Sequence, residues 1–323
     1  MIAFAGITVG LILLIFGGTA LVHGATKIAA RLGIPSIVVG LTVVAFGTSM
    51  PELVVNVVGA LHGETGLAFG NVVGSNVANL ALVLGVAAML RPLELHGGLV
   101  QREVPLLLLG TTVLSIFALD ELFEGLPSVV TRSDALVLLL IFSIFIYITV
   151  MDVFRSPQKD ALVTDMKSNP LIGAQAEGRF AWLFVVLGVL LLYGGGELTV
   201  KASVELARRL DLPMVQVGLF IVALGTSMPE LVTSVIAAVR KEPDLAVGNL
   251  VGSNIFNALL VLPVSALVSP IAIPSKGVSD LFFSWALVSL LIPVFIIGKA
   301  RLGRLPGSLM FLSYIVWIIY RIR

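Results

Sequence analysis

Cysteine is absent from this 323-residue chain, and charged residues and histidines are scarce. Without cysteine the chain can form no disulfide, no thiolate metal site and no cysteine nucleophile. Its three histidines, His23, His62 and His96, form no cluster, so an imidazole metal site is not expected. A net charge of +1 without a basic patch argues against nucleic-acid binding. Charged residues make up only 12% of the chain, too few to cover a soluble protein, so we expect a lipid bilayer around it.

Hydrophobic residues make up 58% of the chain, whose mean hydropathy is +1.09. A helix needs about 20 apolar residues to cross a bilayer. Ten stretches are candidates: 2–22, 34–60, 67–90, 104–119, 134–151, 180–200, 212–239, 245–268, 279–297 and 306–320. The first lacks the basic start of a cleaved signal peptide, so we expect it to be retained. We predict an all-α integral membrane protein with ten transmembrane helices.

A polar segment, residues 152–179, separates the fifth and sixth stretches and has the composition of a solvated linker. It divides the chain into a first five-helix unit, residues 1–151, and a second, residues 180–323. Lysines and arginines are more frequent on the linker's side of the membrane than on the other side. The linker is therefore predicted to be cytoplasmic, and both termini periplasmic.

The two units contain the same motifs at an offset of 178 residues, counted from 47 to 225. GTSMPELV occurs at Gly47–Val54 and again at Gly225–Val232, and GNVVGSN at Gly70–Asn76 matches GNLVGSN at Gly248–Asn254. Such agreement indicates a duplication. The matching helices are five spans apart, so they cross the membrane in opposite directions and the repeat is predicted to be inverted. Inverted repeats are typical of secondary transporters, with the binding site near the membrane midplane.

Glu52 and Glu230 occupy matching positions and are the lone Asp, Glu, Lys or Arg residues in 32–63 and 212–239. A carboxylate at the middle of a bilayer costs about 2.5–3.5 kcal/mol on insertion scales, so each needs a compensating partner. No lysine or arginine is available in these core helices, and the simplest partner is a bound cation. Glu197 differs, because Lys201 follows it by one helical turn; a helix-end ion pair is favoured there over a role in the ion path.

Oxygen-bearing residues surround the two glutamates in the sequence. Pro51 and Pro229 are expected to bend or unwind their helices and to free carbonyls nearby. The glycines of the third and eighth stretches should permit close backbone approach or a local break. Hard cations such as Ca²⁺ and Na⁺ prefer oxygen ligands of this kind. In the alternative reading, the same hydroxyl and amide side chains only pack helices together.

Both repeats resemble the alpha repeats of the sodium/calcium exchanger, or cation/calcium exchanger, family. GTSMPEL at 47–53 and 225–231 carries the resemblance, together with the two GN[V/L]VGSN motifs. The bacterial calcium/sodium antiporter branch is most similar, because the linker has no room for a regulatory domain. The resemblance implies an inner-membrane antiporter that exchanges Ca²⁺ for Na⁺ by alternating access, without a cofactor and with one copy sufficient for transport. It implies these ligands: Glu52, Glu230, Thr48, Ser49, Thr226, Ser227, Ser75, Asn79, Ser253 and Asn257, with the carbonyls of Ala45 and Ala223.

Other functions stay open at this point. A Ca²⁺/H⁺ antiporter would use the same carboxylates as proton carriers. Some family members have Asp where this chain has Asn257, so potassium co-transport is a further alternative. An intramembrane hydrolase is disfavoured, because the core helices contain no histidine or lysine to activate a serine. A passive channel fits an inverted duplication less well than alternating access does.

Overall fold

The computed structural model describes residues 2–31, 49–94, 98–155, 181–239, 243–297 and 301–322. Over these ranges the chain is helical, apart from turns and four two-residue strands. Within this described part of the chain, seven helices are long and apolar enough to cross a membrane, or eight if the bent pair Met214–Thr226 and Met228–Val239 is one span. Met50–Leu61 and Glu103–Phe117 are shorter apolar helices. The all-helical membrane class is confirmed, while the count of ten spans stays a prediction.

The long single helices are α1 (Ile2–Arg31), α7 (Gly98–Phe117), α9 (Arg132–Arg155), α12 (Ala181–Leu210), α18 (Gly277–Ile297) and α19 (Arg304–Ile322). Helix α9 continues beyond the expected end of the fifth stretch at residue 151. Two short helices accompany them, α4 (Met50–Leu61) and α8 (Asp120–Glu124). The predicted second stretch begins at residue 34, and its part up to residue 48 lies outside the described residues.

Three further helical runs each combine consecutive α-helical and π-helical segments. The first is α5 (Thr65–Val77), η2 (Ala78–Val83) and α6 (Leu84–Leu90). The second is α13 (Met214–Val217), η4 (Gly218–Val222), α14 (Ala223–Thr226) and, after a bend, α15 (Met228–Val239). The third is α16 (Pro243–Phe256), η5 (Asn257–Val261) and α17 (Leu262–Val268). The bounds of α15 and α17 equal those of α4 and α6 shifted by the repeat offset, so the duplication extends to secondary structure.

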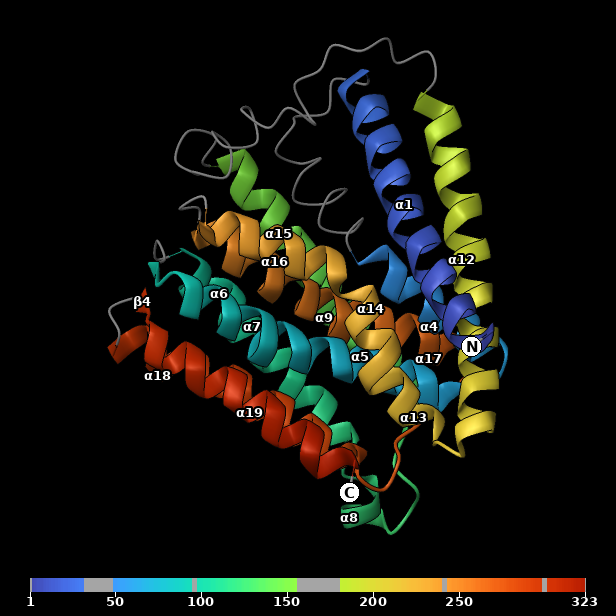
Figure 1. Cartoon of the computed structure of the whole chain (residues 1–323). Coiled ribbons are helices and arrows are strands. Elements are labelled where there is room, and N and C mark those ends of the chain that lie inside the picture. Colours follow the sequence, from blue (N-terminus) through green and yellow to red (C-terminus); the bar gives the residue numbers. More distant parts are fainter. Residues whose placement is uncertain are drawn as a thin grey trace.

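Helices α1 and α12 lie side by side along their lengths (Figure 1). Their contact depends on glycine. A Cβ atom on Gly17 would lie 2.8 Å from the backbone nitrogen of Leu192, and one on Gly188 would lie 2.6 Å from that of Leu21. Small residues let membrane helices approach until their backbones touch, which increases van der Waals contact where no hydrophobic effect operates.

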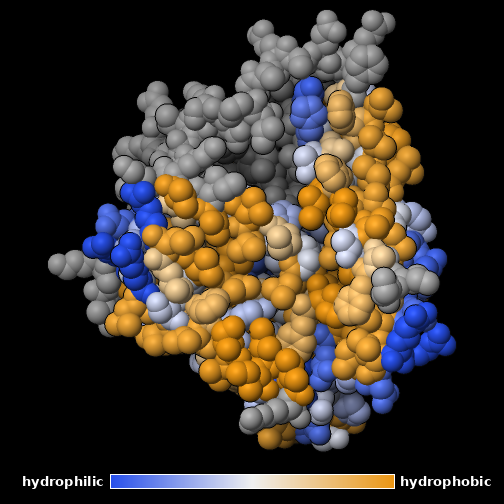
Figure 2. Space-filling view, viewed as in Figure 1, coloured by the Kyte–Doolittle hydropathy of each residue, from blue (hydrophilic) through white to orange (hydrophobic). Residues whose placement is uncertain are grey.

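Two antiparallel strand pairs connect the two halves of the chain. β1 (Leu93–Glu94) pairs with β4 (Arg301–Leu302), and β2 (Val129–Val130) pairs with β3 (Ile271–Ala272). Each pair takes one strand from each half. Hydrophobic side chains cover much of the surface, and hydrophilic residues gather at its left and right edges in Figure 2. This distribution suits a molecule whose middle is surrounded by lipid.

The expected helix disturbances occur in part. Helices α14 and α15 meet at an angle of 44° around Ser227, just before Pro229, as predicted for the seventh stretch. By contrast α5 runs unbroken through Gly70–Asn76, so its glycines serve close approach. A Cβ atom on Gly70 would lie 2.4 Å from the carbonyl oxygen of Val215, which brings α5 against α13 and η4.

Candidate cation site

Two buried carboxylates begin matching helices. Glu52 lies in the first turn of α4 and Glu230 in the first turn of α15, and each is only 1% exposed. The positive end of the helix dipole favours a negative charge at this position by about 0.3–1 kcal/mol. No described lysine, arginine or histidine forms an ion pair with Glu52. The helix terminus therefore offsets only a small part of the cost of burying this charge.

Serine hydroxyls link the surroundings of the two glutamates across the halves. Ser227 Oγ donates to Glu52 Oε1 at 3.4 Å, and Ser253 Oγ donates to Glu230 Oε1 at 3.1 Å. Ser49 Oγ in turn donates to Ser253 Oγ at 3.4 Å. Glu52 Oε2 has no hydrogen-bond partner within the described part of the chain. Each carboxylate thus accepts a serine hydroxyl, and at Glu52 one carboxylate oxygen keeps unused acceptor capacity among the described residues.

The carbonyl of Ala223 lies at the bend but is not freed from its helix. It accepts the backbone N–H of Ser227 at 3.0 Å, and also the hydroxyls of Ser75 at 3.4 Å and Thr226 at 3.3 Å. Within the range from Ala223 to Pro229 where a freed carbonyl is expected, the carbonyl of Ala223 is thus not the freed one. Pro229 lacks the N–H that would reach four residues back, so Gly225 is the residue whose carbonyl loses its helical partner.

The asparagines lie where π-helical turns begin. Asn79 is in η2 and Asn257 opens η5, a feature that no sequence pattern indicated. π-helical turns are rare in proteins as a whole, and those that occur are often found at functional sites. Asn79 Nδ2 donates to Asn254 Oδ1 at 3.0 Å, and Asn254 Nδ2 donates to the carbonyl of Asn76 at 3.1 Å. The Oδ1 atoms of Asn76, Asn79 and Asn257 have no hydrogen-bond partner in the described ranges.

Two other asparagines of the repeated motifs, Asn71 and Asn249, join neighbouring helices and do not cap helix ends. Asn71 Nδ2 donates to Asn56 Oδ1 at 2.6 Å, and Asn249 Nδ2 donates to Ser234 Oγ at 3.0 Å. These two bonds occupy matching places in the repeats. Asn71 Oδ1 also accepts the hydroxyl of Thr226 at 3.1 Å.

The structure thus brings most of the predicted ligands into one buried region. The described candidates are each at most 4% exposed: Ser49, Glu52, Ser75, Asn79, Ala223, Thr226, Ser227, Glu230, Ser253 and Asn257. Thr48 and Ala45 lie outside the described residues. The predicted ion pair of Glu197 is confirmed, because Lys201 Nζ lies 3.0 Å from Glu197 Oε2, but it lies in the middle of α12 and not at a helix end. Within the described ranges no three His, Asp or Glu side chains gather as a metal site, so any cation here needs hydroxyl, amide or carbonyl oxygens as well.

Residues 2–151 and 180–323 match the sequence profile of the family described as sodium/calcium exchanger protein. The chain belongs to the sodium/calcium exchanger family. This family member is 34% identical to the inner membrane protein YrbG of Escherichia coli, over 98% of this chain and 96% of that protein. It is 30% identical to the sodium/calcium exchanger MaX1 of Methanosarcina acetivorans, over 98% of this chain and 97% of that protein.

Two solved structures share the architecture of this exchanger-family chain. The sodium-calcium exchanger NCX_Mj is 28% identical and matches with a TM-score of 0.65, covering 99% of this chain and 98% of that one. The H⁺/Ca²⁺ exchanger CAX is only 15% identical, with a TM-score of 0.78 over 98% of this chain and 82% of its own, and this likeness shows the fold alone. Family membership makes the chain a multi-pass membrane transporter and not an enzyme.

Proposed function

We propose that this protein is an antiporter that exchanges Ca²⁺ for Na⁺ by alternating access, at a site built on Glu52 and Glu230. The observation that carries the proposal is the pair of buried carboxylates at the same place in two copies of one motif. A buried charge without an ionic partner is expensive in a membrane, and a transported cation supplies that partner. The names of the relatives MaX1 and NCX_Mj, both sodium/calcium exchangers, support the choice of ions.

The proposed ligands are the twelve expected from the sequence. Ca²⁺ takes six to eight oxygen ligands, more than two carboxylates provide. Asn79 and Asn257 each have an unused amide oxygen, and Ser75 and Ser253 lie in the same hydrogen-bonded region. The carbonyl of Ala223 would exchange its hydroxyl donors for an ion. Thr48 and Ala45 are included as the repeat counterparts of Thr226 and Ala223.

We further propose ten spans arranged as two inverted units, 1–151 and 180–323. Strand pairing supports the inversion. α6 leads into β1 at one end of α7, whereas α17 leads into β3, which pairs with β2 beyond the other end of α7. A helix of 20 residues is about 30 Å long. The equivalent helices α6 and α17 would then finish on opposite sides of the membrane.

An asymmetry between matching bonds supports alternating access. Asn79 donates to Asn254 Oδ1, and the repeat equivalent of this bond would run from Asn257 to Asn76 Oδ1. Asn76 Oδ1 has no hydrogen-bond partner among the residues that the structure describes. Of two hydrogen bonds that the repeat symmetry would make equivalent, the structure forms the one from Asn79 to Asn254 and not the one from Asn257 to Asn76. In the proposed cycle the halves exchange these roles, as inverted repeats permit.

The decisive experiment is uptake of ⁴⁵Ca²⁺ into proteoliposomes loaded with Na⁺, with the pH equal on both sides. We expect rapid uptake that stops when the sodium gradient is removed, with or without K⁺. Uptake that ignores Na⁺ but follows a pH gradient would identify H⁺ as the coupling ion. A lack of uptake under either gradient would refute the proposal.

We also propose a place in the membrane. The relative YrbG is named as an inner membrane protein, and the lysine and arginine distribution favours a cytoplasmic linker with both termini in the periplasm. Ca²⁺, Na⁺ and the bilayer would be the partners of the protein, and one copy would be sufficient for transport.

A further inference from the structure

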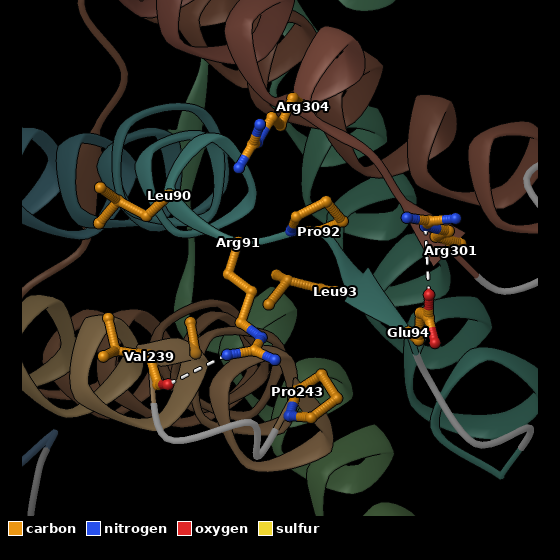
Figure 3. A pocket seen from close by; sticks show the side chains of 10 residues that line it. Leu90, Arg91, Pro92, Leu93, Glu94, Val239, Pro243, Arg301 and Arg304 are labelled. Atoms are coloured by element: carbon orange, nitrogen blue, oxygen red, sulfur yellow. Dashed lines mark hydrogen bonds and ion pairs between the residues drawn. The ribbon is translucent and has the colours of Figure 1, made fainter.

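A second site candidate lies away from the glutamates. A cavity of about 550 Å³ opens where α6 and α15 end and where α16 and α19 begin (Figure 3). Three arginines and one glutamate contribute to its lining: Arg91, Arg301, Arg304 and Glu94. None of the proposed cation ligands lines it. An excess of positive charge in the lining disfavours Ca²⁺ and Na⁺, so a different kind of ligand fits this cavity better.

Only part of the positive charge in the cavity is neutralised. Arg301 Nε lies 3.3 Å from Glu94 Oε1, and these two charges balance. Arg91 uses one of its five N–H donors on the carbonyl of Val239 at 3.4 Å, at the end of α15. Neither Arg91 nor Arg304 forms an ion pair with another described residue. The described lining residues thus carry a net charge of +2, beside the positive ends of α16 and α19.

The chemistry of the lining indicates what would bind. Guanidinium groups match phosphate oxygens in pairs, and helix N-termini add backbone donors for the same kind of anion. The rim is apolar, since Leu90 is 54% and Val239 is 58% exposed. We propose that this cavity binds a phosphate group, and the apolar rim favours the headgroup of an anionic membrane lipid as its source. Basic pockets between membrane helices bind such headgroups.

The other half of the chain supplies an internal comparison. By the repeat offset, Arg91 corresponds to Ser269. Arg304 is the first residue of α19, the last helix of the second half, and Arg132 is the first residue of α9, the last described helix of the first half. Arg132 already donates to the last two carbonyls of α17, at 3.0 and 3.4 Å. At the opposite end of the molecule, the fold thus needs no two arginines that lack a carboxylate partner: Ser269 stands in place of one, and Arg132 is used on helix carbonyls. Among the described residues Arg91 and Arg304 have no carboxylate partner, so their charges can bind an anion.

The test measures lipid retention directly. Purified protein in mild detergent receives phosphatidylglycerol or phosphatidylcholine, and native mass spectrometry counts the lipids that remain bound. We expect the wild type to retain phosphatidylglycerol in preference. Arg91→Gln and Arg304→Gln should each weaken this retention about fivefold, as expected for about 1 kcal/mol per arginine. Arg304→Lys should keep part of it, because the charge is preserved.

Arg132→Gln is the matched control, since it removes the same charge from the opposite end. Retention equal to that of the wild type is expected. A second arm adds inorganic phosphate without lipid and follows thermal unfolding; arginine-dependent stabilisation in this arm alone would support the phosphate site with a soluble source. If Arg91→Gln does not fold, because Arg91 also caps α15, Arg304→Gln carries the test. Unchanged retention in Arg304→Gln with no effect of phosphate would overturn the proposal, as would an equal loss in Arg132→Gln.

Discussion

Replacing Glu52 by glutamine should stabilise the ion-free protein while it removes calcium binding. Glu52 is 1% exposed, its Oε2 has no described hydrogen-bond partner, and its bond from Ser227 is long at 3.4 Å. A buried charged group left short of partners costs about 1–3 kcal/mol. Glutamine keeps the shape without the charge, and the helix terminus favours the carboxylate by about 0.3–1 kcal/mol. We therefore expect Glu52→Gln to raise the free energy of unfolding by about 1–2 kcal/mol in the absence of Ca²⁺ and Na⁺.

Thermal unfolding in detergent, with chelator or with Ca²⁺, measures both effects. The free energy of unfolding of the wild type should rise by about 2.7 kcal/mol when Ca²⁺ is present at 100 times its dissociation constant. Glu52→Gln should gain nothing and should transport no Ca²⁺ in proteoliposomes. Glu197→Gln is the matched control: the same change in a membrane helix, at a carboxylate paired with Lys201, should leave transport intact. Calcium-dependent stabilisation or near-normal transport in Glu52→Gln would refute the reasoning.

Four further predictions follow from the same structure. The resemblance to sodium/calcium exchangers implies that three Na⁺ replace one Ca²⁺, which would move one charge per cycle. An imposed potential should therefore change the exchange rate, at about 2.3 kcal/mol per charge per 100 mV, and an insensitive rate would contradict this. Asn257→Asp adds a buried charge that needs its own counter-ion, so cation competition assays should show altered selectivity, and unchanged selectivity would contradict the ligand role. Asp280→Asn removes the carboxylate that lies 3.2 Å from the 5% exposed Arg321, and it should lower the free energy of unfolding by about 3–5 kcal/mol. Adding Arg321→Gln should restore part of the lost stability, whereas a single variant as stable as the wild type would speak against the pair. Since the chain has no cysteine, single cysteines can be introduced in the linker, residues 152–179, and at the C-terminus. They should react with impermeant reagents from opposite sides, and labelling of both from one side would disprove the orientation.

The candidate site could be predicted from the sequence to the level of residue types. Glu52 and Glu230 stand out because each is a lone charge in an apolar stretch, and a bilayer penalises such a charge wherever the helix packs. Their hydrogen-bond partners could not be predicted in the same way. The donor to Glu52 is Ser227, in the other half of the chain, although Ser49 is much nearer in sequence. Spacing in the sequence predicts which side chains are neighbours on the same helix, but not which side chains meet across two helices.

The buried pair of Asp280 and Arg321 was missed altogether. Asp280 Oδ1 accepts the indole N–H of Trp317 at 3.0 Å, and Arg321 Nε lies 3.2 Å from Oδ2. Both residues lie near helix ends, where hydropathy assigns charges to water. Only the packing of α18 against α19 puts them inside the protein, so no pattern within either helix could have indicated the contact.

By itself, the sequence determined the membrane class, the duplication and the two isolated carboxylates. These features follow from the transfer free energy of each segment and from identity between segments, and neither depends on how helices are arranged. Only the tertiary structure decided the π-helical turns at Asn79 and Asn257, the strand pairs shared between halves, and the arginine cavity. These depend on contacts between residues far apart in the chain. Such contacts exist only when the packing of several helices brings their side chains within reach of one another.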